Sequence, residues 1–125
     1  MRMLLDTNVF LWVLAGSDRI SKVRDLILAD ETEVFVSVAS FWEIAIKHTI
    51  GKLALDVPEA RCAAIDSGFH ELPVLGAHTE ALSKLPLLHR DPFDRLLVAQ
   101  AIVEPMRLMT GDGSMAQYSE LVMRI

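Results

Sequence analysis

Four acidic residues along the chain have the types and positions that metal chemistry requires: Asp6, Glu43, Asp94 and Asp112. Two carboxylates about 4 Å apart repel each other by roughly 4 kcal/mol at an effective dielectric constant of about 20. A cluster of three or four therefore either becomes partly protonated or holds cations. Mg²⁺ and Mn²⁺ are the divalent ions that best suit such oxygen ligands. If these side chains converge, they predict metal-assisted hydrolysis of a phosphodiester, in which the ions activate water and stabilise the developing charge.

The elements that must position these acids alternate along the sequence. Short apolar runs predict strands near residues 3–5, 34–37, 72–75, 107–110 and 121–125. Stretches with helical spacing predict helices between them, near residues 8–15, 21–30, 40–50, 58–67, 77–85, 92–104 and 114–118. This alternation is typical of a layered α/β domain with a parallel sheet.

The predicted strands and helices place the acids near one edge of that sheet. Asp6 ends the first strand, and Asp112 follows the fourth. Glu43 lies in the helix after the second strand, and Asp94 opens the helix that precedes the fourth. Open parallel sheets bind ligands beyond the carboxyl ends of their strands. Three of the four segments reach this edge by topology alone, and the long connection before the fourth strand can bring Asp94 there.

Helix capping offers a purely structural explanation for several of these acids. Asp91 and the proline after it predict an N-cap, which places Asp94 in the first turn, where the helix dipole favours a negative charge. Ser40 and Glu43 match a capping box. Asp112, between two glycines that leave its position loosely held, could occupy a turn or an N-cap.

Asp6 fits a capping role least well, because Thr7 or Asn8 could cap the following helix instead. A charged residue at the end of a central strand is costly to bury unless it is paired, and no lysine or arginine lies beside it in sequence. Two hypotheses stay open: a catalytic metal site, or a binding module whose acids only cap helices. Only the first predicts that Mn²⁺ raises the melting temperature.

The composition limits the possible classes of protein. At 125 residues we expect one domain, and 52% hydrophobic residues without a membrane-length stretch imply burial in a covered sheet or against a partner. Cys62 is the single cysteine and groups with none of the four histidines at zinc-ligand spacing, so we expect no disulfide and no structural zinc. The N-terminal apolar run is interrupted by Asp6, too early for the core of a signal peptide, so we expect a cytoplasmic protein. The net charge of −5 disfavours nucleic acid unless bound cations offset the acids.

Two other phosphate chemistries lack the residues they need. A phosphatase with an aspartyl nucleophile would have Asp-x-Asp after the first strand, whereas Asp6 is followed by Thr7 and Asn8. A phosphoacceptor receiver domain would have a lysine near the end of its last strands, and none lies around Thr110. Both activities are therefore disfavoured.

Four motifs occur along the chain in this order: Leu4-Leu5-Asp6-Thr7-Asn8, Ser37-Val38-Ala39-Ser40-Phe41-Trp42-Glu43-Ile44, Arg90-Asp91-Pro92-Phe93-Asp94-Arg95-Leu96-Leu97 with Ala99-Gln100-Ala101, and Met109-Thr110-Gly111-Asp112. Together they resemble the PIN-domain ribonucleases, and among these the VapC-type toxins of toxin–antitoxin modules. The resemblance covers essentially the whole chain. It implies a single PIN-like nuclease domain over residues 1–125, with a three-layer α/β/α fold and a parallel five-stranded central sheet.

The resemblance also implies a function: a Mg²⁺- or Mn²⁺-dependent endoribonuclease that acts as the toxin of a type II toxin–antitoxin module. The family's three principal metal-binding, catalytic acids are matched by Asp6, Glu43 and Asp94, and the fourth, more variable acid by Asp112. Two polar positions that support the site are matched by Asn8 and Thr110.

Three partners follow from the resemblance: an RNA substrate, a second copy in a homodimer, and a small antitoxin that occupies a groove and blocks the acidic pocket. Residues 9–14 are apolar on all sides of their helix, which favours burial against a partner. Arg95 could contact phosphate or pair with Asp91 one helical turn away. The basic residues near the acids that could contact phosphate are Lys47, His48, Lys52, Arg90 and Arg95.

Overall fold

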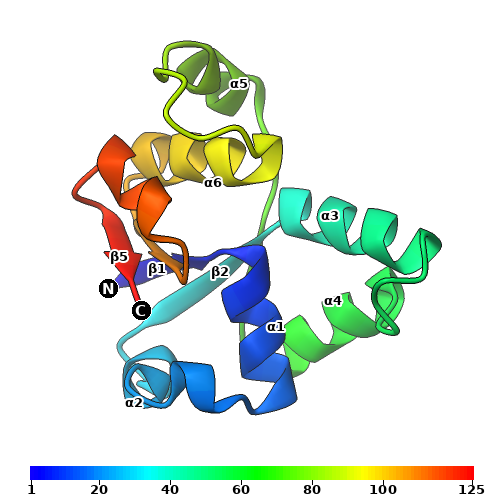
Figure 1. Ribbon diagram of the computed structural model, residues 1–125. Helices are drawn as coiled ribbons and strands as arrows, with labels where there is room; N and C mark the ends of the chain where they lie inside the picture. Colours follow the sequence, from blue (N-terminus) through cyan, green and yellow to red (C-terminus); the bar gives the residue numbers. More distant parts are fainter.

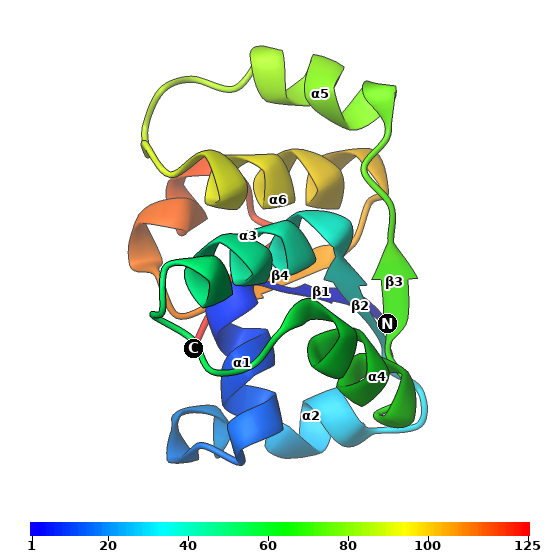
Figure 2. The same ribbon diagram turned by 90° about the vertical axis from the view of Figure 1, so that its right-hand side faces the viewer.

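A computed structural model describes residues 1–125 and contains one five-stranded sheet. Its strands are β1 (Arg2–Leu5), β2 (Glu33–Ser37), β3 (His70–Leu72), β4 (Arg107–Thr110) and β5 (Val122–Arg124). All neighbouring strands are parallel, in the order β3-β2-β1-β4-β5 (Figure 1 labels β1, β2 and β5; Figure 2 labels β3 and β4). Because β1 is the central strand and is buried along most of its length, its residues read as a continuous apolar run.

Helices cover both faces of the sheet. They are α1 (Thr7–Ala15), α2 (Arg24–Leu28), α3 (Val38–Thr49), α4 (Val57–Asp66), α5 (Gly76–Ser83) and α6 (Pro92–Val103), with two short 3₁₀ helices, η1 (Asp18–Ile20) and η2 (Gly113–Tyr118). In Figure 2, α5 and α6 lie above the sheet, and α1, α2 and α4 lie below it. The predicted three-layer α/β/α architecture is confirmed. None of these helices has both the length and the apolar character needed to span a membrane.

Alternation along β1 divides the core between the two faces of the sheet. Met3 and Leu5 belong to a cluster that also includes Phe10 of α1 and Phe41 of α3. Leu4 faces the other way, into a cluster formed mainly with α6 and β4. Side chains that alternate in a strand pack against opposite layers, so this one strand holds both layers of helices on the sheet.

Two predicted elements differ from those observed. Of the helix predicted over residues 21–30, only the short helix α2 forms, after a turn at residues 21–23 that follows the 3₁₀ helix η1. Ser17 caps η1 by accepting from the backbone N–H of Arg19, which starts a tight turn before the helix. The strand predicted over residues 72–75 is β3 and ends at Leu72, because the next residue, Pro73, has no N–H for the ladder.

The apolar character of α1 is explained largely within the chain. Val9 and Phe10 are buried, and the next four residues, Leu11 to Leu14, are half-buried against the same core cluster. The apolar character of residues 9–14 therefore does not require a partner surface. Four exposed apolar side chains lie along α3 and its C-cap instead, at positions 38, 42, 46 and 50.

Candidate active site

The carboxyl ends of β1 and β4 lie side by side and bring two of the predicted acids together. From β1 the chain moves to β2 on one side, and later returns to β4 on the other, so the strand order reverses between β1 and β4. Asp6 directly follows β1, and Asp112 lies two residues beyond β4. Ligand sites of open parallel sheets form at such a point. The topology thus places both acids at the position expected for a site.

Asp6 is 4% exposed, and both of its carboxylate oxygens accept hydrogen bonds. Oδ1 accepts from the backbone N–H of Val9 at 2.7 Å, which makes Asp6 the N-cap of α1. The prediction that Thr7 or Asn8 provides this cap is wrong, because α1 begins one residue earlier, at Thr7. Oδ2 accepts from the Thr110 hydroxyl at 2.6 Å. A carboxylate oxygen has two lone pairs, so each of these oxygens retains one for another ligand.

Thr110 connects the two strand ends through its hydroxyl. Its Oγ1 donates to Asp6 and accepts from the backbone N–H of Asp112 at 3.0 Å. Thr110 is fully buried at the end of β4, so this hydroxyl is held between the two acids. The predicted support by Thr110 has a direct structural counterpart, whereas Asn8 is exposed on α1.

Glu43 lies on α3, one turn in from the start of that helix. Ser37 caps α3 by accepting from the Ala39 N–H at 3.0 Å, so the predicted capping box between Ser40 and Glu43 is wrong. The reason is that α3 begins at residue 38, directly after β2, and residue 40 already lies within its first turn. Glu43 pairs instead with Lys47 at 3.0 Å, and its side chain is 14% exposed.

Two contacts between helices fix where Glu43 and Asp94 lie. The buried hydroxyl of Thr7, at the start of α1, donates to Ser40 of α3 at 2.9 Å. The rings of Trp42 and Phe93 meet edge to face with 4.9 Å between centroids, and each is the chain neighbour of one of the two acids. Neither contact is evident from spacing along the chain, because both join residues from distant segments.

Asp94 is held in the first turn of α6. As predicted, Asp91 is the N-cap, with Pro92 at the first helical position, and its carboxylate accepts from the N–H groups of Phe93 and Asp94. Burial raises the pKa of Asp94 from 3.8 to about 6, and nearby carboxylates add to this, while His89 opposes it. Arg95 does not pair with Asp91: its guanidinium donates to the carbonyl oxygen of Leu85 at 3.2 Å.

Asp112 caps η2, as its sequence context suggested. Its Oδ1 accepts from the hydroxyl of Ser114 at 2.7 Å and from the Ser114 N–H at 2.9 Å, and these bonds lower its pKa. The glycines on either side do not indicate a loose segment. A Cβ on Gly111 would lie 2.6 Å from the ring of Trp12, so glycine is needed there for close packing.

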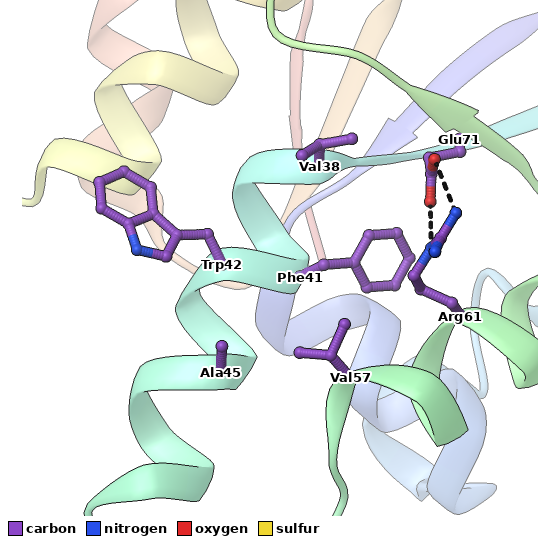
Figure 3. Close-up of a pocket in the computed structure, with 7 residues that line it drawn as sticks. All are labelled: Val38, Phe41, Trp42, Ala45, Val57, Arg61 and Glu71. Carbon is purple, nitrogen blue, oxygen red and sulfur yellow. Dashed lines mark hydrogen bonds and ion pairs between the residues drawn. The ribbon is translucent and has the colours of Figure 1, made fainter.

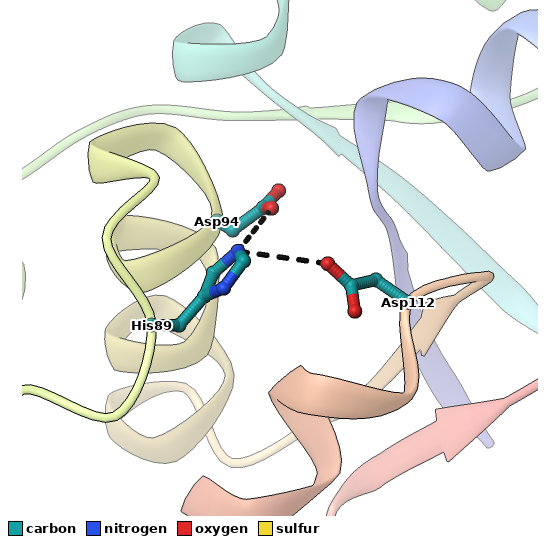
Figure 4. A group of neighbouring side chains, drawn as sticks. All are labelled: His89, Asp94 and Asp112. Carbon is teal, nitrogen blue, oxygen red and sulfur yellow. Dashed lines mark hydrogen bonds and ion pairs between the residues drawn. The ribbon is translucent and has the colours of Figure 1, made fainter.

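His89 is the site residue that sequence reasoning missed. Its Nε2 lies 2.9 Å from Asp94 Oδ2 and 3.6 Å from Asp112 Oδ2 (Figure 4). One ligand atom from each of these three residues lies within 4.8 Å of the other two. The signal in the sequence was its position five residues before Asp94, in the connection between α5 and α6.

Electrostatic coupling links the four predicted acids. Burial raises the pKa of Asp6 above its ordinary value, hydrogen bonds from Thr110 and Val9 oppose this, and the charges of Glu43 and Asp112 raise it further. The charge of Asp6 in turn raises the pKa of Asp94. Asp94 and Asp112 share the tight group with His89, while Asp6 and Glu43 lie outside that group but near enough to repel.

The donor set fits a hard divalent cation. Burial, and after it the charge of neighbouring carboxylates, raises the pKa of Asp6 and of Asp94. A bound cation would neutralise such buried, neighbouring carboxylates and so stabilise their charged form. Oxygen ligands of this kind suit Mg²⁺ and Mn²⁺.

The fold and the site together define a class: an α/β/α domain whose acidic residues meet at the carboxyl edge of a parallel sheet. The family model described as PIN domain matches residues 3–121, and the chain belongs to this family, whose members are nucleases. The resemblance to PIN-domain proteins in the sequence motifs is thereby confirmed at the level of the family.

Two solved structures share this fold. One is VapBC2 from Rickettsia felis bound to a DNA fragment from its promoter, with 15% identity, a TM-score of 0.76, and coverage of 100% of this chain and 99% of that chain. The other is a toxin–antitoxin complex from Klebsiella pneumoniae, with 19% identity, a TM-score of 0.66, and coverage of 98% and 99%. A search of curated proteins found no match.

Proposed function

We propose that the protein is a Mg²⁺- or Mn²⁺-dependent endoribonuclease that acts as the VapC-type toxin of a type II toxin–antitoxin module. The observation that carries this proposal is geometric: at the carboxyl edge of the sheet, the Thr110 hydroxyl joins Asp6 to Asp112, and His89 Nε2 lies 2.9 Å from Asp94 and 3.6 Å from Asp112. Membership of a family of nucleases supports it. So do structural neighbours that are toxin–antitoxin complexes.

The four acids would hold the metal, and the bound ion would supply an activated water and stabilise charge on the phosphate. The chain's own part is to hold the carboxylates in place. Asp6 is oriented by Thr110 and by the Val9 N–H at the start of α1, so neither oxygen rotates freely. Asp112 is oriented by Ser114. Such outer hydrogen bonds orient ligands and increase their basicity.

Lys47 is the best placed of the predicted RNA contacts. Its ammonium group lies 3.0 Å from Glu43, and its side chain is one-third exposed, so the ammonium could turn to a phosphate once a metal ion neutralises Glu43. Arg95 is less suited, since its guanidinium is directed toward the carbonyl oxygen of Leu85. Arg90, which is exposed and follows His89 in the chain, is a second candidate.

The antitoxin would bind the apolar stripe of α3. Trp42 is 60% exposed, and the other members of the stripe recur every four residues along the helix and its C-cap: Val38, Ile46 and Ile50. Next to the stripe lies a hollow of about 320 Å³, lined mainly by apolar side chains and bordered by the ion pair of Arg61 and Glu71 (Figure 3). A second hollow of about 250 Å³ continues along the same helix.

This surface suits an amphipathic segment of a small partner. An apolar face would fill the hollows, and the exposed charges of Arg61 and Glu71 would meet polar groups at its border. Glu43 directly follows Trp42 in α3, so a chain bound along the stripe would lie beside the acids and could block them.

We also propose a homodimer that works in the cytoplasm. Exposed apolar side chains outside α3 would be available to a second copy, among them Leu87, Leu88, Ile102 and Val103. Size-exclusion chromatography with light scattering measures this directly, and a mass of a single chain at micromolar concentration would contradict the dimer.

Purified protein tests the catalytic proposal. We expect wild-type protein to cleave RNA only with Mg²⁺ or Mn²⁺, and the Asp6→Asn and Asp94→Asn variants to keep the fold and lose cleavage. If Asp6→Asn cleaved RNA at the wild-type rate with Mg²⁺, the site assignment would be wrong. The melting temperature should also rise with Mn²⁺, because an ion that binds only the folded state stabilises it. A melting temperature unchanged by Mn²⁺ would favour a binding module, in which Asp6, Asp91 and Asp112 serve only as the helix caps they form.

A further inference from the structure

The geometry points to His89 as a nitrogen ligand of the metal, one that favours Mn²⁺ over Mg²⁺ at this site. The inference rests on the proposed function, because it needs a divalent ion at the acidic cluster. It adds a ligand that the four carboxylates do not include. The side chain is 20% exposed, and its Nε2 faces Oδ2 atoms of both Asp94 and Asp112 (Figure 4).

The hydrogen bonds of Ser114 determine which ring nitrogen of His89 carries a proton and which one can bind a metal ion. The Ser114 hydroxyl has one hydrogen, and it donates this to the carboxylate of Asp112 at 2.7 Å. Toward His89 Nδ1, 3.2 Å away, the Ser114 oxygen can then only accept, so Nδ1 carries a proton. Without metal, a proton joins Nε2 to Asp94 Oδ2, 2.9 Å away; a cation that displaces this proton meets the lone pair of Nε2, because Nδ1 keeps its own proton.

This arrangement matches that of histidines bound to metals. Such histidines donate their other ring N–H to an outer partner, which sets the tautomer and the orientation of the ring. Ser114 occupies that outer position here, and it is itself held by Asp112. The ring plane is thus fixed from the side opposite the acids.

The backbone of His89 is anchored independently of the acidic cluster. The hydroxyl oxygen of Tyr118, at the end of η2, accepts from the N–H groups of Leu88 at 3.0 Å and His89 at 2.8 Å. The connection between α5 and α6 is therefore tied to the segment that carries Asp112 and Ser114. This tie keeps the imidazole beside the carboxylates without any contribution from the acids themselves.

An imidazole ligand changes which ion the site prefers. Imidazole nitrogen is a softer ligand than carboxylate, and it suits transition metals, whereas Mg²⁺ keeps oxygen ligands and water. A bond to His89 therefore increases the affinity of the site for Mn²⁺ more than its affinity for Mg²⁺. Without it, the acids alone would bind both ions through oxygen.

Pulsed electron paramagnetic resonance of the Mn²⁺-loaded full chain tests the inference without relying on activity. We expect modulation from a directly bonded ¹⁴N nucleus in wild-type protein, and its replacement by ¹⁵N signals when histidine is labelled with ¹⁵N in the ring. The modulation should disappear in His89→Gln and remain in His70→Gln, a control at an exposed histidine of β3. Mn²⁺ that binds without ¹⁴N modulation in the wild type overturns the inference.

Titration of each ion against the melting temperature gives the second measurement. We expect the ratio of the Mg²⁺ to the Mn²⁺ dissociation constant to fall at least about fivefold in His89→Gln, with Mg²⁺ binding changed less than about twofold. An unchanged ratio contradicts the role of His89. Failure of the wild type to bind either ion contradicts the proposed function instead, so the two failures are distinguishable.

Discussion

The hydroxyl of Thr110 donates to Asp6 Oδ2 at 2.6 Å, joining the ends of two neighbouring strands whose residues lie 104 positions apart in the chain. The same hydroxyl accepts from the N–H of Asp112. Thr110→Val keeps the shape of the side chain but leaves both groups without this partner. We expect a loss of about 1–3 kcal/mol in unfolding free energy and weaker Mn²⁺ binding, measured by denaturant unfolding and by titration.

Thr32 offers a matched control for this substitution. Its hydroxyl is buried and has no hydrogen-bond partner, so Thr32→Val removes an oxygen that contributes no bond. We expect its unfolding free energy to stay within about 0.5 kcal/mol of wild type or to increase, and Mn²⁺ binding to be unchanged. Equal effects of the two substitutions would show that the Thr110 bond has no particular role.

The raised pKa of Asp94 predicts a pH-dependent stability in metal-free protein. The folded carboxyl has a pKa of about 6 against an ordinary value of 3.8, mainly because it is buried. Between these values the folded state holds a proton that the unfolded state has lost, so this contribution to stability is present below about pH 4 and is lost as pH rises through about 6. Asp94→Asn has no charge to bury at high pH.

We therefore expect Asp94→Asn to be more stable than wild type at pH 7.5, by on the order of 1–3 kcal/mol, and to show little difference near pH 4. Denaturant unfolding with a chelator present at both pH values measures the difference. A stability difference that does not change with pH would contradict the assigned cause.

Close packing at Gly111 predicts that a methyl group there disturbs the site. The Cβ of Gly111→Ala would lie 2.6 Å from Cη2 of Trp12, a side chain packed against the core. We expect a cost of about 1–3 kcal/mol and weaker metal binding, because Asp112 is the next residue. Gly76→Ala is the control, since a Cβ at Gly76 meets nothing within 4 Å. If Gly111→Ala changed neither stability nor metal binding, the Trp12 ring would have to move away without cost.

The apolar stripe of α3 predicts a variant that separates inhibition from catalysis. Ile50 is 58% exposed and lines the second hollow. Ile50→Lys should leave RNA cleavage by the isolated protein unchanged and weaken binding of a co-expressed antitoxin at least tenfold, measured by pull-down and calorimetry. Ile65→Lys is the control, because Ile65 is 69% exposed on α4 and lines neither hollow. Equal loss of binding in both variants would argue against the α3 surface.

Local sequence signals predicted the elements well wherever a strong stop or start was present. Asp91 and the proline after it begin α6 as expected, and Gly16 ends α1 in the left-handed conformation that glycine adopts easily. The region of residues 21–30 was predicted less well. Its apolar spacing is helical, but only α2, a short helix, forms there after the turn of η1.

The chemistry of the site was visible in the sequence, since four acids stood beside predicted strand ends and helix starts. The Asp91 cap is expected to position Asp94, whereas for Asp6 and Asp112 the sequence leaves capping and site formation as alternatives, and the structure combines them. Asp6 and Asp112 each cap a helix through Oδ1 while Oδ2 faces the site region, toward Thr110 and His89 respectively. A carboxylate has two oxygens, and spacing along the chain cannot show that they serve two purposes.

The sequence by itself determined the order of elements, the parallel sheet and the acids, because hydrophobic period, caps and strand ends are local properties. Only the tertiary structure decided which of the many polar residues meet at the site. The contacts of Thr7 with Ser40, of Thr110 with Asp6, and of His89 with Asp94 and Asp112 depend on how helices pack on the sheet. Likewise, the sequence shows apolar residues on both α1 and α3, and only the structure shows that those of α1 pack in the core while a stripe on α3 stays exposed. Residues with the same local sequence pattern can end up in the site, in the core or on the surface, and only the packing of distant segments decides which.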